Sequence, residues 1–352
     1  ANVIVKVDPQ SAHEMDPGNG VILATYADEL YSRRPSREAE AVPAILARRA
    51  LLADPTAVEA LTVLGYQAQL RGEVDQAKRI FAYSNDLSRR ELRPRLWAIE
   101  EAVTRGDIAG ALTNYDIALR TSRAASDILY PTLTAALSEP RIRAELLNIL
   151  LDAPMWRDQF LTYAARSTIQ PREVVSLFKE ADKQGLKIDE GLRASLVNIL
   201  VSQGMVAEGW RYYLTYNPKA RSDQVRDPNF AGYRENPTIF DWRTDGNSRL
   251  DAAILQKGKV GLLDFHAPPS VGGIVVSQMQ VLPPETYYLR GRSRGLEQPQ
   301  SSQPYWILEC HDGRELGRII LPNSQESGGN FDGRLTVPQD CPAQTLSLIA
   351  RS

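Results

Sequence analysis

The feature that most constrains this chain is a pattern that repeats after about 34 residues. Shifting the stretch Val58–Glu91 by one such period places Gly72 on Gly106. Each glycine comes where one helix must stop and turn, and glycine supplies the backbone freedom for such a turn. Small residues beside aromatic ones then allow neighbouring helices to approach closely, so the pattern predicts stacked helical hairpins. The other matching pairs are Glu73 with Asp107, Ala77 with Ala111, Phe81 with Tyr115 and Ser84 with Ala118.

Helix pairs with this period and these residues resemble the tetratricopeptide repeat. Leu61, Leu64 and Gly65 complete the resemblance on the leading helix of the first unit. The run Ala53-Asp54-Pro55 closes a preceding unit in the way that such repeats usually end. We therefore expect three units in phase up to about Arg120, which is the number that stacked repeats normally need for stability.

Helical spacing of apolar residues extends well beyond the clear repeats. At Gly204 the pattern partly returns, with its phase shifted by four positions. We expect an extended leader over residues 1–20 and a right-handed, tetratricopeptide-like α-solenoid over residues 21–218. Ser36 is a candidate N-cap for the second of its helices. Helices are expected at 21–34, 38–53, 125–138, 140–151, 154–167, 171–184 and 190–203.

The character of the chain changes at Asn217-Pro218, where periodicity gives way to proline, glycine and asparagine. Residues 219–247 are expected to form a linker that leads into a second domain over residues 248–352. Short β-rich runs at regular spacing, separated by turn clusters, predict an antiparallel β-sandwich. The predicted fold class is therefore multidomain α + β. Strands are expected at 260–265, 273–282, 286–294, 305–311, 316–321, 331–337 and 344–350.

Several short motifs follow one another in this β-rich part. They are Phe240-Asp241-Trp242, Gly261-Leu262-Leu263, Gln278 with Gln280, Pro283-Pro284, Tyr287-Tyr288-Leu289 and Trp306-Ile307-Leu308. In this order, over about residues 229–352, they resemble the carbohydrate-binding modules and galactose-binding-like jelly rolls. The resemblance implies a jelly-roll sandwich with a capacity to bind sugars. Glu285 stands where the family usually has glycine, so the turn there departs from the family pattern.

Strand alternation places four side chains of the 286–294 run on one face, opposite the expected core face. They are Tyr288, Arg290, Arg292 and Arg294. The three guanidinium groups would lie roughly 6.5–7 Å apart along the strand and repel one another. Acidic side chains on neighbouring strands, such as Glu309, or an anionic ligand would offset that repulsion. The face is thus either a solvated surface with scattered ion pairs or a binding surface for an acidic glycan.

Two further aromatic side chains have the right chemistry to stack on a sugar ring. Tyr305 falls on the outward phase of its strand and joins Tyr288 as a candidate sugar contact. Trp242 is a candidate too, although a tryptophan in the opening motif of a sandwich is more often a core residue. Trp306 is in phase with Leu308 and is expected in the core.

Four side chains of the helical part are candidate contacts for a protein partner, which would bind as an extended or helical peptide. They are Arg49, Tyr66, Asn85 and Tyr115. The alternative is that some of them only pack between helices.

Cys310 and Cys341, the only two cysteines, lie 31 positions apart. They either form a disulfide, which would indicate an oxidising compartment, or remain two buried thiols. Two cysteines with His311 are too few for a four-ligand thiolate metal site, so no metal and no cofactor are expected. The chain begins at Ala1, which fits cleavage after a signal peptide as well as trimming.

The overall composition excludes some functions. The net charge of -2 gives no basis for a nucleic-acid partner, and no apolar run is long enough to span a bilayer. Phosphate-loop, dinucleotide-binding, zinc-protease and serine-hydrolase motifs are all missing from the sequence. The chain resembles the tetratricopeptide proteins that are common in exopolysaccharide assembly and export. That resemblance implies a non-enzymatic scaffold of the bacterial cell envelope, periplasmic or secreted, in such a setting. The alternatives are a lectin for acidic polysaccharide, and a glycoside hydrolase or esterase with its site in the interdomain groove.

Overall fold

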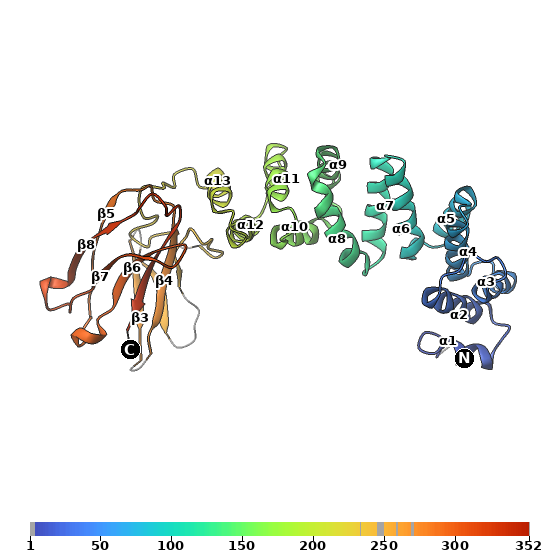
Figure 1. Ribbon diagram of the computed structural model, residues 1–352, viewed down its shortest axis with the longest axis horizontal. Helices are drawn as coiled ribbons and strands as arrows, with labels where there is room; N and C mark the ends of the chain where they lie inside the picture. The colour runs from blue at the N-terminus through green and yellow to red at the C-terminus, as the bar shows by residue number, and fades with distance from the viewer. Residues whose placement is uncertain (1–3, 233, 245–249, 258–259, 269–270, 352) are drawn as a thin grey trace. The chain divides into compact units, whose positions relative to one another are not determined.

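The computed structural model describes residues 4–232, 234–244, 250–257, 260–268 and 271–351. A helical N-terminal half is followed by antiparallel strands (Figure 1), so the predicted multidomain α + β class is confirmed. The chain forms two compact units, Ala1–Phe160 and Leu161–Ser352. Their boundary lies inside the helical half and not at the change from helices to strands. Within the described residues, no helix is both long enough and apolar enough to cross a membrane.

The first unit consists of helical hairpins. The pair α4 and α5 recurs one sequence period later as the pair α6 and α7, as the repeated glycines predicted. The helices up to α9 are α1 (Pro9–Met15), α2 (Gly20–Arg33), α3 (Val42–Ala53), α4 (Val58–Leu70), α5 (Val74–Leu87), α6 (Leu92–Thr104), α7 (Ile108–Thr121), α8 (Ala125–Ala135) and α9 (Pro140–Leu151), with a short 3-10 turn at Ala136–Ser138.

The two repeat glycines turn the chain as predicted. Gly72 has φ 78° and Gly106 has φ 71°, both in the left-handed region. In the first hairpin the Glu73 amide donates to the Ala68 carbonyl at 2.9 Å, and the equivalent bond closes the helix before Gly106. This is the Schellman arrangement, which needs a left-handed residue directly after the helix.

Small and aromatic residues interlock inside the first hairpin. A Cβ atom added to Gly65 would lie 2.6 Å from Cζ of Phe81, so the close approach of α4 and α5 requires glycine there. The Phe81 ring is fully buried, stacks on Trp97 at 4.7 Å and meets Tyr66 edge-on at 5.1 Å. This aromatic cluster packs the first hairpin against α6.

Two expectations about the N-terminal part are wrong. The leader is not extended throughout, because α1 lies within it and buries Ala12 completely. Ser36 does not cap a helix: its hydroxyl accepts a hydrogen bond from the Glu38 amide in the turn before α3. Helix α3 begins at Val42, where Pro43 occupies the first turn and presets the helical φ angle.

The second unit begins with helices. Its helices are α10 (Arg157–Arg166, which contains the unit boundary), α11 (Pro171–Lys183), α12 (Glu190–Ser202) and α13 (Val206–Tyr216). Gly204, between α12 and α13, has φ 77°, and the Met205 amide donates to the Leu200 carbonyl at 2.9 Å. The hairpin turn of the clear repeats therefore returns here, as the glycine spacing indicated.

The described part of the chain contains all seven predicted strands, together with two that the sequence did not indicate, β1 and β2. Strand β2 was missed because its alanines have low β propensity, and β1 is only two residues long. The strands are β1 (Arg243–Thr244), β2 (Asp251–Lys257), β3 (Val260–His266), β4 (Gly273–Gln280), β5 (Thr286–Arg292), β6 (Tyr305–Cys310), β7 (Glu315–Ile320), β8 (Asn330–Thr336) and β9 (Gln344–Ala350).

The strands form a five-stranded antiparallel sheet of order β1-β4-β9-β6-β7 and two antiparallel pairs, β2-β3 and β5-β8. One hydrophobic core joins all three: Trp306 and Leu348 of the large sheet pack with Leu335 of β8, and the partly buried Leu263 of β3 packs against them. Alternate residues of β6 and β9 belong to that core, as expected for a strand that faces a core on one side. They are Trp306, Leu308 and Cys310 of β6 and Leu346, Leu348 and Ala350 of β9.

Candidate functional site

On the first unit, one arginine connects the leading helices of three consecutive hairpins. Arg93 of α6 forms an ion pair with Asp28 of α2. Its guanidinium carbon lies 5.3 Å from the centre of the Tyr66 ring on α4, and the Tyr66 hydroxyl donates to the Arg93 carbonyl at 3.2 Å. The predicted contact residue Tyr66 is therefore half-buried in a polar network on the faces of α2, α4 and α6.

Acidic groups outnumber Arg93 on these faces. Burial raises the pKa of Glu91, and the nearby carboxylates of Glu59 and Asp28 raise it further. Burial also raises the pKa of Tyr66, to which the charge of Glu100 contributes. Acidic side chains therefore lie near Tyr66 together with the Arg93 cation, whose charge acts on Tyr66 more strongly than that of Glu100 and lowers its pKa.

The other three predicted protein contacts lie elsewhere, on the second helices of their hairpins. Arg49 is exposed on α3 and donates to the Pro17 carbonyl at 3.4 Å. Asn85 is half-buried on α5, and Tyr115 on α7 is only 8% exposed. Sequence reasoning did not select Arg93. A signal was present, because Glu59 lies one repeat length before Arg93, so oppositely charged residues occupy equivalent positions of successive repeats.

The β5–β8 pair presents the outward face that strand alternation predicted. Tyr288 is 75% exposed, and the neighbouring residues of β5 alternate between exposed and half-buried. Across the pair, Tyr288 is opposite Arg334, and Arg290 is opposite Asp332. Arg334 therefore adds a fourth arginine to this surface, and Asp332 adds the acid directly opposite one of them.

The arginines of this face are only weakly neutralised. Arg292 donates from Nε to the Gly328 carbonyl at 3.2 Å, and Arg294 follows the end of β5. In the part of the chain that the structure describes, Arg290, Arg292 and Arg294 form no ion pair. Glu309, the internal partner that the sequence suggested, lies on β6, which pairs with β7 and β9, whereas β5 pairs with β8; among the described residues no ion pair joins Glu309 to these arginines. Glu309 instead acts on Arg318 of the neighbouring strand β7. The hydrogen bond between Arg318 and Glu315 raises the pKa of Arg318, and the charge of Glu309 adds to that effect.

The remaining two predicted sugar contacts are less available. The half-buried Tyr305 ring has the guanidinium groups of Arg318 and Arg351 at 4.2 Å and 4.9 Å from its centre. Trp242 is 9% exposed, lies 5.7 Å from Trp306 between ring centres and donates from Nε1 to the Asp227 carbonyl at 2.9 Å. Trp306 is buried in the core, as predicted.

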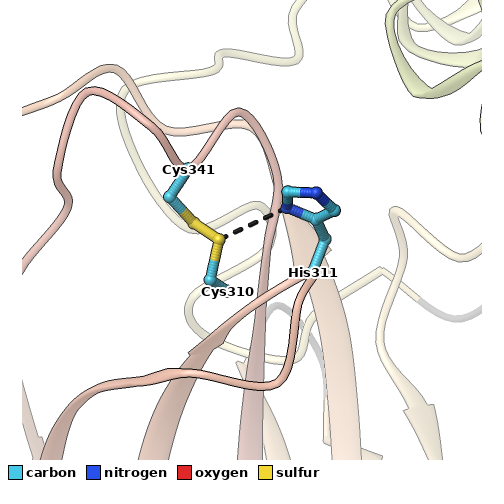
Figure 2. A group of neighbouring side chains, drawn as sticks. All are labelled: Cys310, His311 and Cys341. Carbon is cyan, nitrogen blue, oxygen red and sulfur yellow. Dashed lines mark hydrogen bonds between the residues drawn. A yellow bond between two sulfur atoms is a disulfide. The ribbon is translucent and has the colours of Figure 1, made fainter.

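Cys310 and Cys341 form the predicted disulfide, with an S–S distance of 2.08 Å (Figure 2). The imidazole of His311 lies beside it, with Nδ1 3.3 Å from the Cys310 sulfur. Among the described residues these three form a group with metal-like spacing. Cysteines joined in a disulfide are not thiolates, however, and so cannot act as metal ligands.

The structure also shows a site that sequence reasoning missed: a cavity of about 670 Å³ in the second unit. It lies between the end of α13, the segment expected to be a linker, and the strands β1, β2 and β4. Trp242 lines it, and so do Tyr213, Tyr216, Arg226 and Asp241. Most of its lining comes from the single stretch Tyr213–Thr244, to which Ile254 and Gln278 are added. This stretch has little periodicity, so no local pattern indicated that it folds around a cavity.

A buried carboxylate organises one wall of this cavity. Asp241 Oδ1 accepts a hydrogen bond from the Tyr213 hydroxyl at 2.7 Å and forms an ion pair with Nε of Arg234 at 3.1 Å. Its Oδ2 accepts from the Thr238 amide at 2.9 Å and the Thr238 hydroxyl at 2.7 Å. Burial raises the pKa of Tyr213, and the Asp241 charge raises it further. Both oxygens of Asp241 are thus fully engaged.

Arg226 forms another wall and is only 8% exposed. Its Nε donates to the Phe240 carbonyl at 2.7 Å and one terminal nitrogen donates to the Met279 carbonyl. The guanidinium carbon lies 5.0 Å from the centre of the Trp210 ring. The other terminal nitrogen, Nη1, is buried without a hydrogen-bond partner among the described residues. Burial lowers the pKa of Arg226 to about 10, so it remains a cation at neutral pH.

Comparison with known proteins assigns no family to this chain. No protein-family model matches the sequence, and no curated protein is significantly similar to it.

Proposed function

We propose that this protein is a non-enzymatic adaptor of the bacterial cell envelope that binds an acidic glycan through its β-sandwich and a protein segment through its helical hairpins. The observation on which this proposal rests is the β5–β8 face, where the exposed Tyr288 lies on the same two strands as Arg290, Arg292 and Arg334. Exopolysaccharide assembly or export is the setting that we propose for this activity. The Cys310–Cys341 disulfide supports a periplasmic or secreted location, since disulfides persist in oxidising compartments.

The chemistry of the face suits an acidic polysaccharide. The flat ring of Tyr288 offers an apolar surface on which a sugar can stack, with its hydroxyl free to contact water or ligand. Guanidinium groups bind carboxylates through paired, charge-assisted hydrogen bonds. A neutral sugar would use only the tyrosine and would leave the arginines repelling one another.

The helical hairpins support the second part of the proposal. Acidic groups surround the Tyr66–Arg93 contact on α2, α4 and α6. Negative potential on a surface favours a partner segment with lysine or arginine side chains, mainly by speeding association and excluding acidic partners. A basic peptide is therefore the kind of ligand that this surface would select.

The carboxylates in the second-unit cavity favour a binding role over hydrolysis. Glycosidases need two carboxyl groups free to act on the substrate. Asp241 accepts three hydrogen bonds and forms an ion pair with Arg234, and Asp227 accepts hydrogen bonds from the amides of Ala231 at 2.8 Å and Gly232 at 2.9 Å. The carboxylates of Asp241 and Asp227 are thus occupied by contacts within the chain.

Titration calorimetry of the full chain with polygalacturonate, and with its fully methyl-esterified form, tests the glycan proposal. We expect binding of the acid form only, weakened about tenfold or more by Tyr288→Ala and by Arg290→Ala. Tyr83→Ala and Arg211→Ala, which remove an exposed tyrosine and an exposed arginine elsewhere, are matched controls. Equal affinity for both forms, or full affinity in the Arg290→Ala variant, would refute the proposal.

A further inference from the structure

Three side chains with the chemistry of metal ligands meet at one end of the large sheet (Figure 2). Cys310 is the last residue of β6, His311 follows it directly, and Cys341 lies shortly before β9. The two sulfur atoms and a ring nitrogen of His311 all lie within 4.8 Å of one another. None of the three belongs to the β5–β8 face, so this group can be tested independently of the function proposed for that face.

The chain holds these residues close by contacts other than the bond between the two sulfurs. Cys310 is opposite Gln344 in the pairing of β6 with β9. The Gln344 side chain donates from Nε2 to the Cys341 carbonyl at 2.6 Å. An ion pair between Arg314 and Asp340, at 2.9 Å, joins the two turns that carry the cysteines. We therefore expect the three side chains to stay together when the disulfide is reduced.

The spacing of the group suits a metal ion once the sulfurs are separate. A thiolate sulfur lies about 2.3 Å and an imidazole nitrogen about 2.0 Å from a bound ion, so ligand atoms of one site lie roughly 3.5–4 Å apart. Nδ1 of His311 is 3.3 Å from the Cys310 sulfur. The Cα atoms of the two cysteines are 5.7 Å apart, so rotation about their Cα–Cβ bonds can separate the sulfurs to that distance without moving the backbone. Residues 311–314 are exposed, which gives an ion access from the side of His311.

We propose that the reduced form of this protein binds copper(I) through the thiolates of Cys310 and Cys341 and Nδ1 of His311. A dithiol reductant supplies the two electrons and two protons that convert the disulfide into two thiols, and it leaves as its own disulfide. Binding of the ion then displaces the two thiol protons. Oxidation of the cysteines back to the disulfide removes both thiolates and so releases the ion.

The ligand set favours copper(I) over zinc. Soft thiolate ligands select copper(I) and zinc among the common metals, and imidazole suits both copper and zinc. Structural zinc sites almost always have four ligands, whereas this group supplies three. Copper(I) forms stable complexes with three ligands. Cys310 and Cys341 are buried, which disfavours water as a fourth ligand. The reductant that keeps the cysteines as thiols also keeps copper in its lower oxidation state.

Competition between the full chain and the copper(I) chelator bicinchoninate, followed by the absorbance of the chelator complex, tests this site. We expect the dithiol-reduced chain to bind one equivalent of copper(I) and the oxidised chain to bind none. X-ray absorption at the copper edge should show two sulfur neighbours and one nitrogen neighbour. Equal binding by the oxidised and reduced chains, or a copper ion with sulfur neighbours alone, would overturn the proposal.

His311→Asn is the most informative variant, because it removes the ring nitrogen and keeps both cysteines. We expect at least tenfold weaker copper(I) binding by its reduced form. His266→Asn removes a histidine on β3, outside this group, and should leave the affinity unchanged. Circular dichroism of each reduced variant checks that it is folded. Full affinity in His311→Asn, or an equal loss in His266→Asn, would overturn the proposal.

Discussion

Asp241 shows how much of the second unit depends on one buried side chain. It accepts three hydrogen bonds, from Tyr213 of α13 and from two groups of Thr238, and it forms an ion pair with Arg234. These contacts connect the last helix with the segment that leads into the sandwich. The same segment is held by a hydrogen bond from the Ile239 amide to Asn198 Oδ1 of α12 at 2.8 Å. What the sequence presents as a linker is therefore a packed part of the unit.

Asp241→Asn should lower the free energy of unfolding of the second unit by about 3 kcal/mol, because the amide leaves Arg234 with one acid fewer and cannot accept from every current donor. Chemical denaturation followed by circular dichroism measures this. Glu190→Gln removes the other, more exposed acid that pairs with Arg234 and should cost less than about 1 kcal/mol. Equal losses in the two variants would contradict the special role of Asp241.

The tyrosines of α13 predict an alkaline loss of stability. Burial raises the pKa of Tyr212, Tyr213 and Tyr216 above the ordinary value of 10.0. Above about pH 10 the unfolded chain loses these phenolic protons while the folded chain retains them, so the free energy of unfolding falls as pH rises. Arg226 acts in the opposite direction, because its pKa is lowered to about 10 and the folded chain loses that proton first.

As pH rises, three tyrosines lower the free energy of unfolding and one arginine raises it. We therefore expect a net decrease in stability between about pH 9 and pH 11. Denaturant titrations at several pH values measure it, and ultraviolet absorbance of tyrosinate reports the ionisation directly. The Tyr213→Phe, Tyr216→Phe double variant should show a smaller pH dependence over this range. An unchanged dependence in that variant would mean that other groups cause the loss.

At the scale of elements, prediction of helices and strands from the sequence was most reliable where a rule about neighbouring positions applied. The repeat that places Gly72 on Gly106 located α4 to α7, and alternation assigned the two faces of β5. The strands that the sequence did not indicate were missed for local reasons as well. The alanine-containing strand β2 does not look like a strand, and its place next to β3 comes from pairing, with Ile254 opposite Leu263.

Turn glycines allow a direct test of the repeat. Gly72→Ala and Gly106→Ala should each lower the free energy of unfolding by about 1 kcal/mol, because alanine is strained at φ 78° and 71°. Gly18→Ala is the control, since a Cβ there would meet nothing within 4 Å and its φ is not in the left-handed region. Thermal denaturation of the three variants measures the difference, and an equal effect of Gly18→Ala would contradict the assignment.

At the scale of the whole molecule, the chain has two compact units, of which only the second contains the disulfide. Unfolding is therefore expected in two transitions. Reduction should lower the stability of the second by about 3–4 kcal/mol, the chain-entropy value for a loop of this length, and leave the first unchanged. Calorimetry with and without reductant measures this, with the Cys310→Ala, Cys341→Ala double variant as a reference that reductant should not affect. A shift of both transitions would contradict independent units.

The sequence by itself determined seven of the strands, most of the helices, the order of the helical and β parts, the turns at Gly72 and Gly106 and the outward face of β5. Each of these follows from periodicity or from a residue with special backbone freedom, which are properties of neighbouring positions. Only the tertiary structure decided that α13 belongs to one unit with the sandwich, that Arg93 pairs with Asp28, and that Arg226 lines a cavity with Gln278. These arrangements join positions far apart in the chain, and no local pattern specifies which distant surfaces will pack together.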